Sequence, residues 1–147
     1  MTQFRNYDAP NAPQKTRIQF ERVERPDDYA PPPWESDEGF WPSLDPDAPG
    51  YVPPHAYDSE MEKAQARHDA YVRGVWHMVG VIARAVVSVP IGGGSFATYT
   101  LESPGLWGVE SDSGEEYLNE IFEEEKRALL AAMHEIGQAA AEHLPAS

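Results

Sequence analysis

Proline placement constrains this chain more than any other feature of its sequence. Eleven of the fourteen prolines fall between Pro10 and Pro54, and three of them are consecutive at residues 31–33. Each proline removes a backbone hydrogen-bond donor and disfavours helix in the residue before it. We therefore expect residues 1–57 to form a largely extended arm with one strand, and residues 58–147 to form an α+β core domain.

The arm is unusual for a proline-rich segment because it holds nine of the sixteen aromatic residues. Disordered segments are normally poor in aromatic residues, so something should cover these rings. In one interpretation the arm wraps over its own domain and the rings complete a thin core. In the other, Trp34, Phe40 and Trp41 anchor a partner protein, because large amphipathic rings dominate the hot spots of interfaces.

Three segments show the patterns of β-strands. KTRIQFERVE, residues 15–24, places Ile18, Phe20 and Arg22 at the period-two spacing of a half-buried strand. The run from residue 75 to 89 is largely apolar at both alternating sets of positions, which predicts a central strand covered on both faces. SFATYTL follows the turn sequence PIGGG, so this run and the one before it should form a hairpin.

Two further segments show helical patterns. The first covers about residues 60–73, lacks proline and is followed by Gly74, a residue that commonly ends helices. The second covers about residues 114–141 and is apolar at helical spacing, so we expect one long amphipathic helix packed on the sheet. The predicted fold class is α+β: a small antiparallel sheet with a central hairpin, packed by a long C-terminal amphipathic helix, plus a proline-rich extended N-terminal arm. A serine three residues before a glutamate forms a capping box at the start of each helix: Ser59 with Glu62, and Ser113 with Glu116.

The formal net charge of −14 limits the partners of this chain. Direct nucleic-acid binding takes its affinity from cationic side chains that displace counterions, so it is not expected here. The acidity is also segregated, because residues 110–147 carry ten acids against two bases and residues 26–62 contain no Lys or Arg. An acidic surface of this kind favours basic partners.

Four glutamates of the second predicted helix should line one exposed face. They are spaced three and four residues apart, so they are neighbours on the helix surface and repel one another. One interpretation is a solvated face that confers solubility. The other is a face that imitates the phosphates of a nucleic-acid strand and occupies a groove lined by lysine and arginine. The four residues are Glu116, Glu120, Glu123 and Glu124.

A glycine-bracketed tryptophan precedes this helix in the stretch TLESPGLWGVESDSGEEYL. Gly105 and Gly108 allow a tight turn where positive φ is required, and Trp107 between them should drop into the core beneath the helix start. A surface anchor flanked by acids is the alternative for Trp107.

The segment from about residue 81 to 125 resembles a family of small acidic proteins carried by phages, plasmids and integrated elements. Their shared core is G-L-W-G, an aliphatic residue and then E-S-D-S, which residues 105–113 match. The resemblance implies a setting in mobile-element biology and carries no activity or functional residues. Small acidic proteins in that setting are often antagonists of host nucleases, which is an argument by analogy.

No pattern in the sequence predicts catalysis. There is no cysteine, and the five histidines form no metal-ligand pair at helical spacing. ESDSGEE does not fit a calcium-binding loop, and IGGGS lacks the lysine of a phosphate-binding loop. We therefore expect no enzyme, no cofactor and no metal site.

The sequence predicts a protein of the host-cell cytoplasm that does not enter a membrane. Its N-terminus shows no apolar run of the secretory type. The longest apolar stretch contains His77 and Arg84 and is too short to span a bilayer.

The functional expectation is a non-enzymatic acidic binding protein of mobile-element type. Its leading form is a counter-defence inhibitor, anti-restriction or anti-CRISPR, that acts as a nucleic-acid mimic in the basic groove of a nucleic-acid-handling host protein. One alternative is a structural or accessory protein that acts through homo-oligomer contacts of the aromatic arm, as a homodimer. The other is a metal-assisted hydrolase with a composite carboxylate site.

Overall fold

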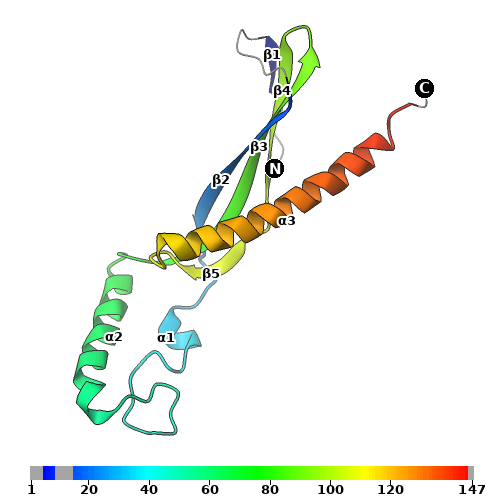
Figure 1. The fold of residues 1–147 in the computed structure, drawn as a ribbon. Coiled ribbons are helices and arrows are strands. Elements are labelled where there is room, and N and C mark those ends of the chain that lie inside the picture. Colours follow the sequence, from blue (N-terminus) through cyan, green and yellow to red (C-terminus); the bar gives the residue numbers. More distant parts are fainter. Residues whose placement is uncertain (1–4, 9–14, 146–147) are drawn as a thin grey trace. The chain divides into compact units, whose positions relative to one another are not determined.

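The computed structural model describes residues 5–8 and 15–145, so residues 1–4 and 9–14 of the predicted arm lie outside it. The fold is α+β, with an antiparallel sheet and a long C-terminal helix, as the sequence predicted. The strands are β1 (Arg5–Asp8), β2 (Arg17–Pro26), β3 (Met78–Gly92), β4 (Ser95–Glu102) and β5 (Leu106–Glu110). The helices are α1 (Pro33–Ser36), a 3-10 turn (Pro54–Ala56), α2 (Tyr57–Val72) and α3 (Glu115–Ala141), as Figure 1 shows.

The chain divides into two compact units, each assembled from segments far apart in the sequence. Unit 1 draws on Met1–Arg25, Gly80–Leu106 and Gly114–Ser147, and unit 2 on Pro26–Val79 and Trp107–Ser113. Each unit therefore contains residues from both sides of position 57.

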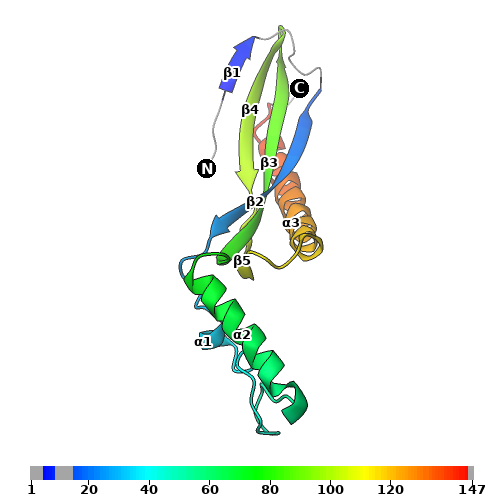
Figure 2. The ribbon, with the colours of Figure 1, turned by 90° about the vertical axis from the view of Figure 1, so that its left-hand side faces the viewer.

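Unit 1 is built on the predicted hairpin. The sheet has the strand order β1-β4-β3-β2, and β5 also pairs with β3. β3 and β4 pair in antiparallel register from Arg84 opposite Glu102 to Gly92 opposite Ser95, which leaves a two-residue glycine turn between the strands. β1 extends the sheet beyond β4. The four main strands lie side by side in Figure 2.

Helix α3 covers one face of this sheet. Leu129 is buried against the odd-numbered side chains of β3, namely Ala83, Ala85 and Val87. Phe20 of β2, Tyr99 and Leu101 of β4, and Phe122 and Met133 of α3 pack around that cluster. The predicted amphipathic helix is thus present with the predicted bounds, although its buried face ends near Met133 and Ile136 is half exposed.

The prediction that β3 is covered on both faces is correct only for the first part of the strand. Residues 79–83 are all buried, whereas residues 84–88 alternate between half-buried and buried. Arg84 on the second face pairs with Glu21 and lies near Glu102. An ion-pairing arginine keeps its head group in water, so this part of the face stays partly open.

Unit 2 is organised around α2, which begins at Tyr57 rather than near residue 60. Its N-terminus has no side-chain cap, so the predicted capping box of Ser59 and Glu62 is wrong. The preceding prolines and 3-10 turn lead directly into the helix. The predicted stop is correct, because the N–H groups of Gly74 and Val75 donate to the carbonyls of Tyr71 and Ala70, the pattern of a Schellman motif.

Candidate functional site

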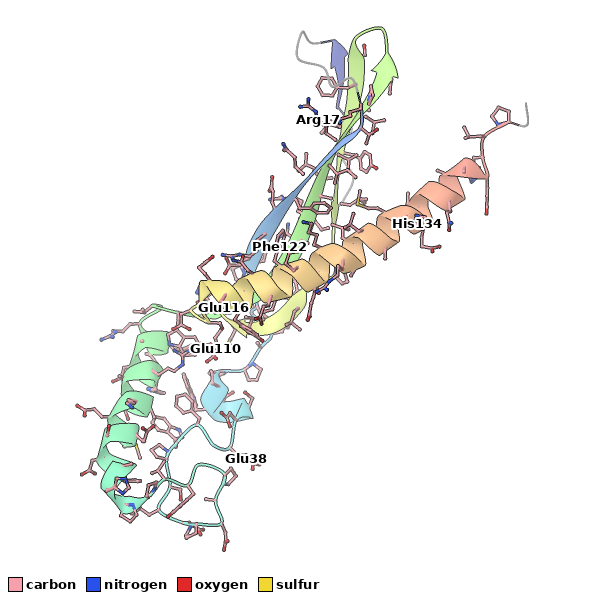
Figure 3. The ribbon with its side chains drawn as sticks, in the orientation of Figure 1. Arg17, Glu38, Glu110, Glu116, Phe122 and His134 are labelled. Carbon is pink, nitrogen blue, oxygen red and sulfur yellow. The ribbon has the colours of Figure 1, made fainter. Side chains whose placement is uncertain are left out.

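The four predicted glutamates lie on the surface of α3, near its N-terminal end. Glu116, Glu120, Glu123 and Glu124 are all exposed, and Glu116 is labelled in Figure 3. Together with Asn119 and Arg127 they line an open hollow of about 400 Å³. Among the described residues, none of the four glutamates makes an ion pair. We call these four residues the acidic face.

Residues 110–125 contain eight carboxylates, which we call the acidic run. The four that do not belong to the acidic face are engaged within the fold. Glu115 forms a two-pronged interaction with Arg22 of β2, with Nη–Oε distances of 3.0 and 2.9 Å. Arg22 also donates to the side-chain oxygen of Asn119 at 2.7 Å. Glu125 accepts the backbone N–H of Gly105 at 2.7 Å. These contacts hold the start of α3 against the sheet of unit 1.

Arg67 of α2 uses the two remaining carboxylates of the run, Glu110 and Asp112. Its guanidinium donates two bonds of 2.9 Å to Asp112 and one of 2.8 Å to Glu110. The same group lies 3.9 Å from the centre of the Trp76 ring, and the backbone carbonyl of Arg67 accepts the Trp76 indole N–H at 3.0 Å. The bonds from Arg67 lower the pKa of the Asp112 carboxyl below its usual value. Arg67 thus anchors β5 to α2 within unit 2.

The serines of the E-S-D-S sequence also serve the fold. Ser111 pairs with His77 through two bonds, one from the His77 N–H to the Ser111 hydroxyl and one from the Ser111 N–H to the His77 carbonyl. Ser113 donates its hydroxyl to the carbonyl of Glu110. The N-cap residue of α3 is Gly114 and has no side-chain cap, so the predicted capping box of Ser113 and Glu116 is wrong. The Ser113 hydroxyl is used by the preceding turn instead.

Trp107 does not occupy the core, which overturns the preferred interpretation of its role. Its side chain is 45% exposed, whereas Trp76 is 2% exposed. Gly105 and Gly108 do have the positive φ values of 87° and 73° that the sequence suggested. The positive φ values are therefore as expected, but the predicted tight turn is wrong, because residues 106–110 form strand β5. Trp107 lines a surface hollow together with residues 26–30.

The aromatic residues predicted as partner anchors pack against one another and against α2. The Trp34 ring lies 5.7 Å from Phe40, 4.5 Å from His68 and 5.0 Å from Tyr71. The Trp41 ring lies 5.0 Å from Phe40 and 5.7 Å from His68. All three predicted anchors are half-buried. This packing favours the interpretation in which the arm completes a thin core.

Comparison with known proteins does not identify a family for this chain. No protein-family model, no curated protein and no solved structure matches this chain at a significant level. Within residues 5–8 and 15–145, no three His, Asp or Glu side chains gather closely enough to hold a metal ion. None of the helices in that part of the chain is both long and apolar enough to cross a bilayer.

The sequence patterns did not identify Arg67 as a residue that joins α2 to β5. Replacing Arg67 tests this role. We expect Arg67→Met to lower the free energy of unfolding by about 1–2 kcal/mol, since it leaves two neighbouring carboxylates without their counter-charge. The loss stays below that for a buried ion pair because a third of the side chain is exposed and water screens the charges. Urea denaturation measures this loss. Lys63→Met on the same helix is the control, and equal losses for the two variants would contradict the role of Arg67.

The carboxylates that pair with arginine side chains should make the protein less stable in acid. Hydrogen bonds from arginine lower the pKa of Glu102, Asp112 and Glu115. A carboxyl whose pKa is lower in the folded state contributes stability above its unfolded pKa, and this contribution is lost as the pH falls through the folded value. We expect the urea midpoint to be nearly constant from pH 6 to 7 and to fall below about pH 4. A midpoint that holds or rises below that pH would contradict the role of these pairs.

Proposed function

We propose that this chain is a non-enzymatic acidic binding protein whose acidic face occupies the basic groove of a nucleic-acid-handling host protein. In this proposal it acts in the host cytoplasm as a counter-defence inhibitor. The observation that carries the proposal is the division of the acidic run into two groups. Glu110, Asp112, Glu115 and Glu125 are engaged by the fold, and the acidic face is made of the four carboxylates that the fold does not use.

The spacing of the acidic face supports mimicry of a nucleic-acid strand. Glu116 and Glu124 are eight residues apart, so the face extends about 12 Å along the helix at ~1.5 Å per residue. Its four charges are therefore about 6, 4.5 and 1.5 Å apart along the axis, a mean spacing of about 4 Å. One strand of B-DNA carries a phosphate about every 3.4 Å. A groove that binds one strand would meet a similar density of negative charge on α3.

The arrangement is also costly for the free protein, which favours a role other than folding. Like charges three and four residues apart destabilise a helix by about 0.2–0.5 kcal/mol per pair. Arg127 at the end of the hollow offers one positive charge against four negative ones. Binding to a basic groove would relieve this repulsion, so the complex gains electrostatic energy that the free helix lacks.

Affinity capture from a lysate of the native host tests this proposal. We expect the wild-type chain to recover a nucleic-acid-handling protein at low salt, and recovery to fall as salt is raised, because exposed charges are screened over about 8 Å at physiological ionic strength. The test variant replaces Glu116, Glu120, Glu123 and Glu124 with Gln. A matched control replaces Glu38, Glu62, Glu135 and Glu142, which are also exposed, and changes the net charge equally. Equal recovery by the two variants would contradict the proposal.

The same quadruple Gln variant should fold at least as stably as the wild type. It removes the repulsion along α3 and none of the ion pairs or hydrogen bonds described above. We expect its free energy of unfolding to be unchanged or higher by up to about 1 kcal/mol. Urea denaturation measures this change, and a clear loss of stability would show that the acidic face serves the fold.

Homo-oligomer contacts through the aromatic arm receive less support than the acidic face. Trp34, Phe40 and Trp41 pack within their own chain, so their rings are already partly covered. Light scattering across a concentration series separates the two functions. A stable dimer without any partner, retained in the quadruple Gln variant, would favour the homo-oligomer function.

A further inference from the structure

A second surface feature lies in unit 2 and shares no residue with the acidic face. It is an open hollow of about 670 Å³. One part of its lining comes from the loop that follows β2, and the other from Trp107 and Gly108 of β5. We call it the Trp107 hollow. Its lining residues are Pro26, Asp27, Asp28, Tyr29, Ala30, Trp107 and Gly108.

The loop of the Trp107 hollow is fixed by the side chain of Asp27. One carboxylate oxygen accepts the backbone N–H groups of Tyr29 and Ala30, both at 3.2 Å. The other accepts the N–H of Gly108 at 2.8 Å, which ties the loop to β5. The backbone N–H of Asp27 donates to the carbonyl of Met78 at 2.9 Å. The backbone of this loop is therefore held against β5 within unit 2.

Three residues that line the hollow are exposed to solvent. The Tyr29 ring is 99% exposed, and the Trp107 ring is 45% exposed. Asp28 is exposed, and its carboxylate makes no hydrogen bond or ion pair to any described residue. The lining contains two acids and no base, and the sequence has no Lys or Arg from residue 26 to 62. The site thus combines two accessible aromatic rings with uncompensated negative charge.

We propose that the Trp107 hollow binds an arginine side chain presented by a protein partner. A guanidinium is planar, stacks on aromatic rings and pairs with carboxylates, so one group can use Trp107, Tyr29 and Asp28 together. Lysine carries a compact, strongly hydrated charge and stacks less well. The volume lies in the range of sites that bind small ligands, so it accommodates the arginine with flanking backbone.

Titration of the full chain with a short capped peptide, Ala-Arg-Ala, tests the proposal directly. The readout is the backbone amide resonances of Ala30 and Gly108 in NMR spectra of the labelled protein at low salt. We expect saturable shifts with the arginine peptide, weaker binding of the matched lysine peptide and no saturable shift with the citrulline peptide, which keeps the shape without the charge. No saturable shift with the arginine peptide would overturn the proposal. Equal binding of citrulline or of lysine would overturn its assignment to arginine.

Variants locate the binding site. Trp107→Leu and Asp28→Asn should each weaken binding of the arginine peptide about two- to fivefold, whereas Trp107→Phe keeps a ring and should retain most of the affinity. Asp47→Asn, an exposed aspartate outside the hollow, is the control and should bind as the wild type does. Wild-type affinity in both Trp107→Leu and Asp28→Asn would overturn the proposed location. Unchanged thermal melting of each variant shows that lost binding does not come from unfolding.

The result does not depend on the function proposed for the acidic face. The quadruple Gln variant of α3 leaves the Trp107 hollow intact, so it should bind the arginine peptide with wild-type affinity. If the peptide fails to bind, only the hollow loses its assigned ligand. If lysate capture fails while the peptide binds, only the function proposed for the acidic face is contradicted.

Discussion

Trp76→Ala is expected to destabilise the protein by about 3–5 kcal/mol, the range for removing a large buried aromatic side chain. The Trp76 ring is 2% exposed and meets Tyr71 edge-on at 5.0 Å. It also lies beneath the guanidinium of Arg67, and its indole N–H donates to the Arg67 carbonyl. Alanine would leave a cavity in unit 2 and remove the indole hydrogen bond to the Arg67 carbonyl. Urea denaturation followed by circular dichroism measures the loss.

Trp107→Ala is the matched control for that prediction. Because its side chain is 45% exposed, we expect a loss below about 1 kcal/mol, as for most surface substitutions. The loss of unfolding free energy for Trp76→Phe should lie between those of the two alanine variants, since phenylalanine keeps an aromatic ring but loses the indole hydrogen bond. If Trp107→Ala lowered the free energy of unfolding as much as Trp76→Ala, Trp107 would have to be a core residue, as the sequence suggested.

Leu129→Ala should destabilise unit 1 by about 2–5 kcal/mol. Leu129 is 4% exposed and is the buried residue of α3 in the cluster with Ala83, Ala85 and Val87. Two of these three neighbours are alanines with no flexible side chain, so they cannot move to fill the space that a smaller residue leaves.

Leu130→Ala makes the same chemical change one position along the helix. Leu130 is 41% exposed, so its loss should stay below about 1 kcal/mol. The two variants are compared by their urea midpoints under the same conditions. Similar losses at both positions would mean that α3 does not pack on the sheet through Leu129.

The sequence predicted the elements whose signals are local. The spacing of apolar residues in α3 gave nearly the correct bounds, because each turn of a helix is encoded within four residues. The hairpin of β3 and β4 was found for the same reason, since the glycine turn and the flanking β-rich runs are contiguous. The strand predicted from Ile18, Phe20 and Arg22 was also present. Phe20 and Arg22 are half-buried, whereas Ile18 is 41% exposed, so the predicted half-buried set is correct only in part.

The missed role of Arg67 concerns contacts between residues far apart in the chain, whereas the two capping-box errors are local. Arg67 is 43 residues from Glu110 and 45 from Asp112, so no local pattern joins them. Trp107 was predicted in the core because it lies between two glycines, but those glycines do not determine whether its side chain is buried. Ser113 and Glu116 matched a capping box, but the hydroxyl of Ser113 was taken by the Glu110 carbonyl.

The acidic run was visible in the sequence, but its division into two groups was not. That division depends on Arg22, Arg67 and the backbone of Gly105, which the fold brings to four of the eight carboxylates. The four predicted on one exposed helix face are the four that make neither an ion pair nor a hydrogen bond through their carboxylates among the described residues. The sequence could identify these four because the spacing of residues on a helix surface depends on neighbouring positions only. It could not show which groups engage the other four carboxylates.

Competition with nucleic acid tests the central claim most directly. Once a nucleic-acid-handling protein has been captured, fluorescence anisotropy measures its binding to a labelled duplex as this chain is added. Mimicry predicts that the wild type and the control variant at Glu38, Glu62, Glu135 and Glu142 displace the duplex. The variant at Glu116, Glu120, Glu123 and Glu124 should fail to do so. Displacement by that variant at wild-type concentrations, or a stable complex that still holds the duplex, would contradict the account.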